Sequence, residues 1–119
     1  MAASSRHDEL PVFVQWTDFI EWLLATTEKF PKSARFALTS RIESLALDVL
    51  EDIVEARYSR SKVEILRRAN LRLEKMRVLL RVCHSRRYLA TNSFEHAARA
   101  IDEAGRMLGG WRKQQEEVA

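Results

Sequence analysis

The chain has 119 residues, enough for one domain, with only three glycines and two prolines. With 31% charged residues as well, this composition excludes a turn-rich β architecture and favours long helices. The formal net charge is only +3, but the charges are segregated along the chain. Residues 1–59 carry 6 Lys and Arg against 10 Asp and Glu, residues 60–90 carry 10 against 2, and residues 91–119 carry 4 against 5.

The sequence predicts neither a membrane segment nor an internal disulfide. Residues 1–10 contain acidic side chains and no apolar run, and no stretch of about 18 consecutive apolar residues occurs. The single cysteine, Cys83, has no partner in the chain, so an oxidising compartment is not required. We therefore expect a soluble, cytoplasmic protein with no membrane partner.

The first two helices are predicted from their start and stop signals. One helix is expected over 11–29, because it opens on a proline and is followed by Phe30-Pro31, which breaks a helix. A second is expected over roughly 33–58, where neither Gly nor Pro occurs. Its buried stripe, at steps of three and four residues, is Leu38, Ile42, Leu45, Val49, Ile53 and Ala56.

The third helix is predicted to begin at a capping box. Ser61 and Glu64 have the spacing at which a serine oxygen and a carboxylate satisfy the first free N–H groups. The helix is expected to fade over 84–90. Its stripe alternates steps of three and four, as in a bundle seam, and comprises Leu66, Ala69, Leu73, Met76, Leu80 and Cys83.

The fourth helix is predicted to begin after Asn92 as N-cap and to fray at Gly109-Gly110. Short connections between helices of this length favour an all-α, up-down-up-down four-helix bundle. We expect the bundle over 11–112, a disordered or partly ordered segment over 1–10, and a tail over 113–119. The fourth stripe is Phe94, Ala97, Ile101, Ala104, Leu108 and Trp111.

A second apolar row is predicted on each of the two central helices, opposite or beside the buried stripe. Such rows indicate self-association, although scattered surface apolar residues are the simpler alternative. Two different patches on one protomer favour a head-to-tail contact, which closes into a ring or barrel if the rotation allows. The rows are Leu47, Leu50, Val54 and Tyr58 on the second helix, and Leu71, Val78 and Val82 on the third.

The third helix is also predicted to carry a basic face beside its outer apolar row. Repeated in every protomer, this face would contact phosphates and release their counterions, so nucleic acid is the expected partner, read by shape or backbone rather than by base. The cations are Arg68, Arg72, Lys75 and Arg86 on one side of the row, and Arg67, Arg77 and Arg81 on the other.

An alternative explains the same cations structurally. The second helix carries four acids that could neutralise the arginines across a helix–helix seam, namely Asp48, Glu51, Asp52 and Glu55. These acids are too few to cancel the whole excess of residues 60–90, so a net basic patch is still expected.

No motif for catalysis or metal binding is present. A di-iron site in a helical bundle needs Glu-x-x-His pairs, and none of the three histidines belongs to one. Phosphate loops and nucleophile elbows are absent as well, so we expect no enzymatic activity, no metal and no cofactor. We interpret Cys83 as a small buried hydrophobe. The three tryptophans are interpreted as core anchors: Trp16, Trp22 and Trp111.

Several blocks between Pro11 and Trp111 carry a family resemblance. They are TEKFPKS (27–33), LALDVL (45–50), EARYSR (55–60), LRRANLRLEK (66–75), RYL (87–89) and EAGRMLGGW (103–111). These blocks resemble the accessory variability proteins of diversity-generating retroelements, within the wider four-helix bundle protein family.

The resemblance implies a homopentameric barrel with a positively charged surface. It implies binding to the retroelement's reverse transcriptase and template-repeat RNA, with DNA a second candidate, in support of mutagenic cDNA synthesis (mutagenic retrohoming). The polymerase chemistry would belong to the reverse transcriptase. Two alternatives stay open: a bundle of the type encoded in ribosomal RNA intervening sequences, and a purely structural homo-oligomer whose arginines form intersubunit ion pairs.

Overall fold

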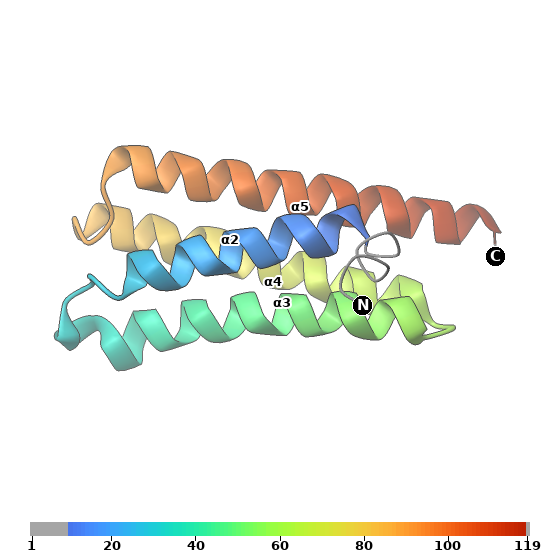
Figure 1. The fold of residues 1–119 in the computed structure, drawn as a ribbon, viewed down its shortest axis with the longest axis horizontal. Helices are drawn as coiled ribbons and strands as arrows, with labels where there is room; N and C mark the ends of the chain where they lie inside the picture. The colour runs from blue at the N-terminus through green and yellow to red at the C-terminus, as the bar shows by residue number, and fades with distance from the viewer. Residues whose placement is uncertain (1–9, 119) are drawn as a thin grey trace, which may run out of the picture.

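The computed structural model describes residues 10–118 as a bundle of four helices, α2 (Pro11–Thr27), α3 (Ser40–Tyr58), α4 (Lys62–Ser85) and α5 (Thr91–Val118). Successive helices run in opposite directions along one long axis (Figure 1). No strand occurs between residues 10 and 118, and the predicted all-α four-helix bundle is confirmed. The segment expected to be disordered, 1–10, lies outside the described residues except for Leu10, which packs against the core.

The core is built from the predicted stripes. All six predicted positions on α4 are buried, as are the four central ones on α5, whereas Leu38 and Leu45 are only partly buried. Trp16 of α2 is completely buried and its indole N–H donates a 2.9 Å hydrogen bond to the Ala46 carbonyl of α3. This bond satisfies the one polar atom of a large apolar side chain, so Trp16 anchors α2 to α3.

The end of α2 and the start of α3 both differ from the predicted boundaries. The first helix ends at Thr27, and α3 begins only at Ser40. The intervening residues form a short 3₁₀ turn, η1 (Lys32–Ala34), and a π-helical turn, η2 (Arg35–Thr39). These turns replace the predicted helical start at residue 33, and they carry the chain from α2 into α3.

The predicted end of the fourth helix at Gly109-Gly110 is wrong. The helix continues through both glycines to Val118, so that residues 113–118, expected as a tail, are helical. Each glycine costs about 1 kcal/mol relative to alanine within a helix. Leu108 is buried and Trp111 packs against the core on either side of the pair, and this tertiary packing outweighs the local cost.

Ser61 directly precedes α4 as predicted, but its capping hydrogen bond does not form, and the predicted cap at Asn92 is wrong. Ser61 makes no side-chain cap; instead its N–H donates to the Ser59 hydroxyl oxygen at 3.0 Å. The fourth helix begins one residue before Asn92, and the Phe94 N–H donates to the Ala90 carbonyl at 2.9 Å. Asn92 therefore lies inside the first turn of α5.

The turn between α3 and α4 is held by a lysine instead. The Lys62 ammonium donates to the carbonyls of Ala56, Arg57 and Ser59 at 2.7, 3.2 and 2.8 Å. These carbonyls lie at the C-terminal end of α3, where backbone acceptors lack helical partners and the helix dipole favours a cation. Lys62 thus ties the first residue of α4 to the last turn of α3.

We expect Lys62→Met to lower the free energy of unfolding by about 1 to 2 kcal/mol, because it removes charged hydrogen bonds to three carbonyls and keeps the aliphatic stem. Urea unfolding followed by circular dichroism measures this change. Lys113→Met is the matched control, since Lys113 is an exposed lysine on α5, outside the α3–α4 turn. Equal midpoints for the two variants would contradict the capping role.

Candidate nucleic-acid interface

The outer side of α4 carries exposed aliphatic side chains, as the sequence predicted. Leu71, Val78 and Val82 are 55%, 57% and 40% exposed. A branched aliphatic residue on a helix surface gains nothing from water, and three of them follow one another along this helix. These three side chains therefore form an exposed apolar ridge along α4 of the protomer.

The predicted row on α3 is less uniform. Leu47 and Val54 are each 43% exposed and Tyr58 is largely exposed, whereas Leu50 is half-buried and packs against the core. At ~100° per residue, Leu47 and Val54 lie on the side of α3 turned away from Asp52. Because Asp52 meets α4, the exposed row on α3 faces away from the ridge on α4.

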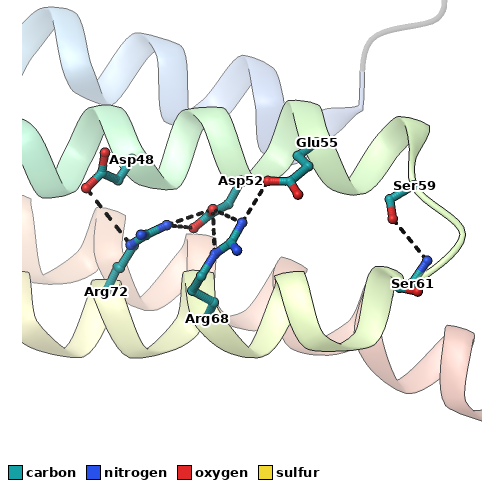
Figure 2. A network of polar contacts seen from close by, with 7 residues as sticks. All are labelled: Asp48, Asp52, Glu55, Ser59, Ser61, Arg68 and Arg72. Atoms are coloured by element: carbon teal, nitrogen blue, oxygen red, sulfur yellow. Dashed lines mark hydrogen bonds and ion pairs between the residues drawn. The ribbon is translucent and has the colours of Figure 1, made fainter.

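Two of the predicted binding arginines converge on one buried carboxylate. Asp52 of α3 is only 2% exposed. Arg68 donates to its Oδ1 through Nε at 3.0 Å and Nη2 at 2.7 Å, and Arg72 donates through Nη1 to Oδ1 and Oδ2 at 2.7 and 2.6 Å (Figure 2). A buried charge needs such partners to be tolerated.

Two further carboxylates surround this pair at the surface. Glu55 accepts a 2.8 Å hydrogen bond from Arg68, and Asp48 lies 4.0 Å from the Arg72 Nε (Figure 2). Hydrogen bonds with Asp52, then with Glu55, raise the pKa of Arg68 above its ordinary value. The alternative in which the acidic helix neutralises the arginines therefore holds for Arg68 and Arg72, whose charges are engaged within the protomer.

Arg67 also has carboxylate partners, but they are exposed. It contacts Glu64 and Glu116, both at 3.2 Å, and its side chain is 52% exposed. Exposed ion pairs of this kind contribute at most about 1 kcal/mol. A phosphate can therefore replace these carboxylates at small cost.

Arg77 bridges α4 and α5. It contacts Glu74 at 3.1 Å and Asp102 at 2.6 Å. Partial burial disfavours its charge, but the hydrogen bonds with Asp102 and Glu74 outweigh that effect and raise its pKa. Both carboxylates are more than half exposed, so this pair remains accessible to a competing anion.

The remaining predicted cations, Lys75, Arg81 and Arg86, are exposed. Within residues 10–118 none of them forms an ion pair with a carboxylate. The guanidinium of Arg86 lies 5.7 Å from the ring centroid of Tyr88, a cation–π distance. These three residues are the cations of the predicted face whose charge no described carboxylate neutralises.

A groove runs between α3 and α4 beside the Asp52 cluster. Its volume is about 720 Å³, and Leu45 and Val78 form part of its apolar wall. Arg41 of α3 and Lys75 of α4 stand on it as well. Asp48 and Glu74 also line the groove, so it combines apolar surface with two cations and two acids. Arg41 was not singled out from the sequence.

The burial of Asp52 was also missed, although a signal for it exists. Asp52 follows the core residue Val49 by three positions and precedes the core residue Ala56 by four. An acid at that spacing lies on the inward side of a helix and demands a cation from its neighbour. Arg68 and Arg72, four residues apart on α4, meet that demand.

Cys83, His84 and His96, the cysteine and histidines of residues 10–118, are used in packing. Cys83 is buried in the core, and burial raises the pKa of its thiol. His84 stacks on Phe94 with ring centroids 4.8 Å apart, and His96 lies 4.4 Å from the Trp22 ring. Residues 10–118 contain no group of three or more His, Cys, Asp or Glu side chains placed to hold a metal ion.

The fold and this surface together define a class of protein: an all-α four-helix bundle with cations beside an exposed aliphatic ridge. None of its described helices has the length and apolar character required to cross a membrane. The family model described as bAvd-like matches residues 12–115, and the chain belongs to that family. This match confirms the resemblance inferred from the sequence blocks. The Avd-like family is an accessory, non-catalytic kind of protein. No curated protein matches the chain.

Proposed function

We propose that this chain is a homo-oligomeric accessory protein of a diversity-generating retroelement. In this role it binds RNA and the retroelement's reverse transcriptase, and it supports mutagenic cDNA synthesis without catalysing a reaction itself. Membership of the bAvd-like family supports the retroelement context. The proposed pentamer and the reverse-transcriptase partner rest on that membership.

The observation that carries the RNA-binding part is the set of unneutralised cations beside the ridge. Lys75, Arg81 and Arg86 are exposed, and no carboxylate of residues 10–118 pairs with them. An oligomer built through the ridge would repeat these cations around its surface and raise the local positive potential. Such a surface suits the closely spaced phosphates of a polynucleotide.

The other four predicted cations have different roles in this proposal. Arg67 and Arg77 exchange their exposed carboxylates for phosphate when RNA binds. Arg68 and Arg72 remain on Asp52 and keep α3 and α4 together, so they support the site without touching RNA.

Electrophoretic mobility shifts at increasing salt concentration test this function. We expect the wild-type protein to bind RNA with an affinity that falls steeply with salt. In the triple variant Lys75→Ala, Arg81→Ala and Arg86→Ala we expect weaker binding. The slope of log K against log salt concentration should become shallower by about 0.7 for each lost single-strand phosphate contact.

A charge-matched variant controls for the loss of three cations. Its substitutions, at exposed positions outside the predicted face, are Arg57→Ala, Arg60→Ala and Lys113→Ala. It should keep the wild-type slope within about one phosphate contact. Equal slopes for the two triple variants would show that these cations of α4 do not contact RNA.

A purely structural homo-oligomer is the second candidate, and the Asp52 cluster favours it for two of the arginines. Absence of RNA binding at every salt concentration would support this candidate over the first. The position of the gene in its genome distinguishes the retroelement role from the bundle type encoded in ribosomal RNA intervening sequences. A reverse-transcriptase reading frame beside this one, and co-purification of the two products, would favour the retroelement role.

A further inference from the structure

The two ends of the bundle differ in charge. One end is formed by the α2–α3 and α4–α5 links, and the opposite end by the α3–α4 turn and the end of α5 (Figure 1). At the first end, residues 29–42 contain four Lys and Arg and no acid, and residues 75–94 contain five and no acid. At the opposite end, glutamates such as Glu55, Glu64 and Glu116 accompany the cations.

The two acid-free segments meet in space. The rings of Phe30, after α2, and Tyr88, after α4, lie with centroids 6.1 Å apart. Phe30 and Leu89 are buried, so both links pack onto the end of the core rather than extending from it. Cations that are about fifty residues apart in the sequence are thereby gathered on one surface.

Five of these cations belong to the two links between helices, and they lack carboxylate partners in the part of the chain that the structure describes. All are exposed, and no ion pair within residues 10–118 involves them. Gathering like charges is unfavourable until an anion binds. These residues are Lys29, Lys32, Arg35, Arg86 and Arg87.

A hollow between α4 and α5 receives two arginines at this end. Its volume is about 550 Å³, and its wall includes Arg81, His84, Arg87 and Thr91. The guanidinium and hydroxyl groups are hydrogen-bond donors, and two fixed positive charges face the same space. The hollow therefore suits a phosphate group rather than an apolar ligand.

Phe36 indicates whether the bound polynucleotide is single-stranded or double-stranded. Its side chain is 86% exposed in η2, directly after Arg35 and close in sequence to Lys32. A single exposed apolar side chain is common, but this one is a flat ring among cations. An aromatic ring beside phosphate-binding cations is the arrangement that stacks an unpaired base.

We propose that this basic end, comprising the five cations above with Phe36, is the part of the polynucleotide-binding surface that is selective for single strands. Cations hold the backbone, the hollow with Arg81 and Arg87 receives a phosphate, and Phe36 stacks on one base. A duplex keeps its bases stacked on one another and offers no free face to Phe36. This inference rests on the proposed function, which it deepens by extending the binding surface from Arg81 and Arg86 around the end of the bundle to Lys32, Arg35 and Phe36.

Fluorescence anisotropy with three labelled probes of equal length tests the proposal: an oligouridylate, an oligothymidylate and a duplex RNA. We expect Phe36→Leu, which keeps an apolar side chain but removes the ring, to weaken oligouridylate binding about fivefold or more and to leave duplex binding unchanged. Phe36→Trp should restore it. Because Phe36 is so exposed, each variant should keep the wild-type circular dichroism spectrum.

A pair of charge variants provides a matched second arm. Lys32→Ala with Arg35→Ala should weaken single-strand binding more than Arg57→Ala with Arg60→Ala, which removes the same charge at the opposite end. Weaker binding of both single-stranded probes would show that the site accepts RNA and DNA. Weaker binding of the oligouridylate alone would show that it is specific for RNA, and either result supports the proposal. Unchanged affinities in the Phe36 and Lys32/Arg35 variants would overturn it and leave the proposed function standing. Wild-type protein that binds none of the probes would overturn both.

Discussion

Replacing Arg68 and Arg72 together by alanine is expected to lower the free energy of unfolding by about 3 to 5 kcal/mol. The reason is the carboxylate that they leave behind: Asp52 is buried and receives its hydrogen bonds from these two side chains. A buried charge without partners costs far more than the loss of two exposed arginines. Chemical denaturation followed by circular dichroism measures the difference.

Two further variants show whether the buried charge is the cause. Replacing Arg67 and Arg77, whose carboxylates are exposed, should cost at most about 1 kcal/mol each. Adding Asp52→Asn to the Arg68/Arg72 variant should recover part of the lost stability, because the uncompensated charge disappears. If the added substitution destabilises the protein further, the loss comes from packing of the arginine stems and this explanation fails.

This cluster also decides which substitutions report on RNA binding. An alanine scan of α4 that includes Arg68 or Arg72 removes positive charge and, in the same step, breaks ion pairs between α3 and α4. A loss of binding in such a variant has two explanations. Variants at Lys75 and Arg81 avoid this ambiguity, since neither side chain forms an ion pair with a carboxylate of residues 10–118.

The sequence predicts the helices and their buried stripes well, because burial of apolar side chains follows helical periodicity. Leu66, Leu73 and Leu80 of α4 are buried where the pattern puts them. It predicts helix ends less well, because local signals compete with tertiary contacts. Gly109-Gly110 stays helical since Leu108 and Trp111 are held by the bundle, a contact that no local propensity contains.

The candidate site is predicted only in part, because charge counted along the chain differs from charge gathered in space. Residues 60–90 are strongly basic, yet Arg68 and Arg72 are neutralised by an acid from another helix. Conversely, Lys32 and Arg35 belong to the first half of the chain, residues 1–59, in which acids outnumber cations by 10 to 6. The fold places them near the α4–α5 link, where their charges add to those of Arg86 and Arg87.

Replacing Leu71 and Val78 by glutamate is expected to convert the proposed oligomer into monomers at micromolar concentration. Both side chains are more than half exposed, so the change does not disturb the protomer's own core. In an interface that buries them, each carboxylate would lose its hydration without gaining a partner, at a cost of several kcal/mol. Native mass spectrometry should show a wild-type species near five protomers and a monomeric variant. Val118→Glu, a similarly exposed position at the end of α5, is the control and should keep the wild-type mass.

The exposed row on α3 makes the geometry of this contact testable. Leu47 and Val54 face away from the ridge on α4, so a head-to-tail contact would join the row of one protomer to the ridge of the next. Leu47→Glu with Val54→Glu should then also give monomers. Mixing the two variants should give dimers and nothing larger, because only one intact row and one intact ridge remain complementary. A ridge-to-ridge contact predicts a different result: the α3 variant would keep the wild-type mass, and the mixture would form no dimer of one copy of each. A wild-type protein that is monomeric at micromolar concentration would contradict both geometries.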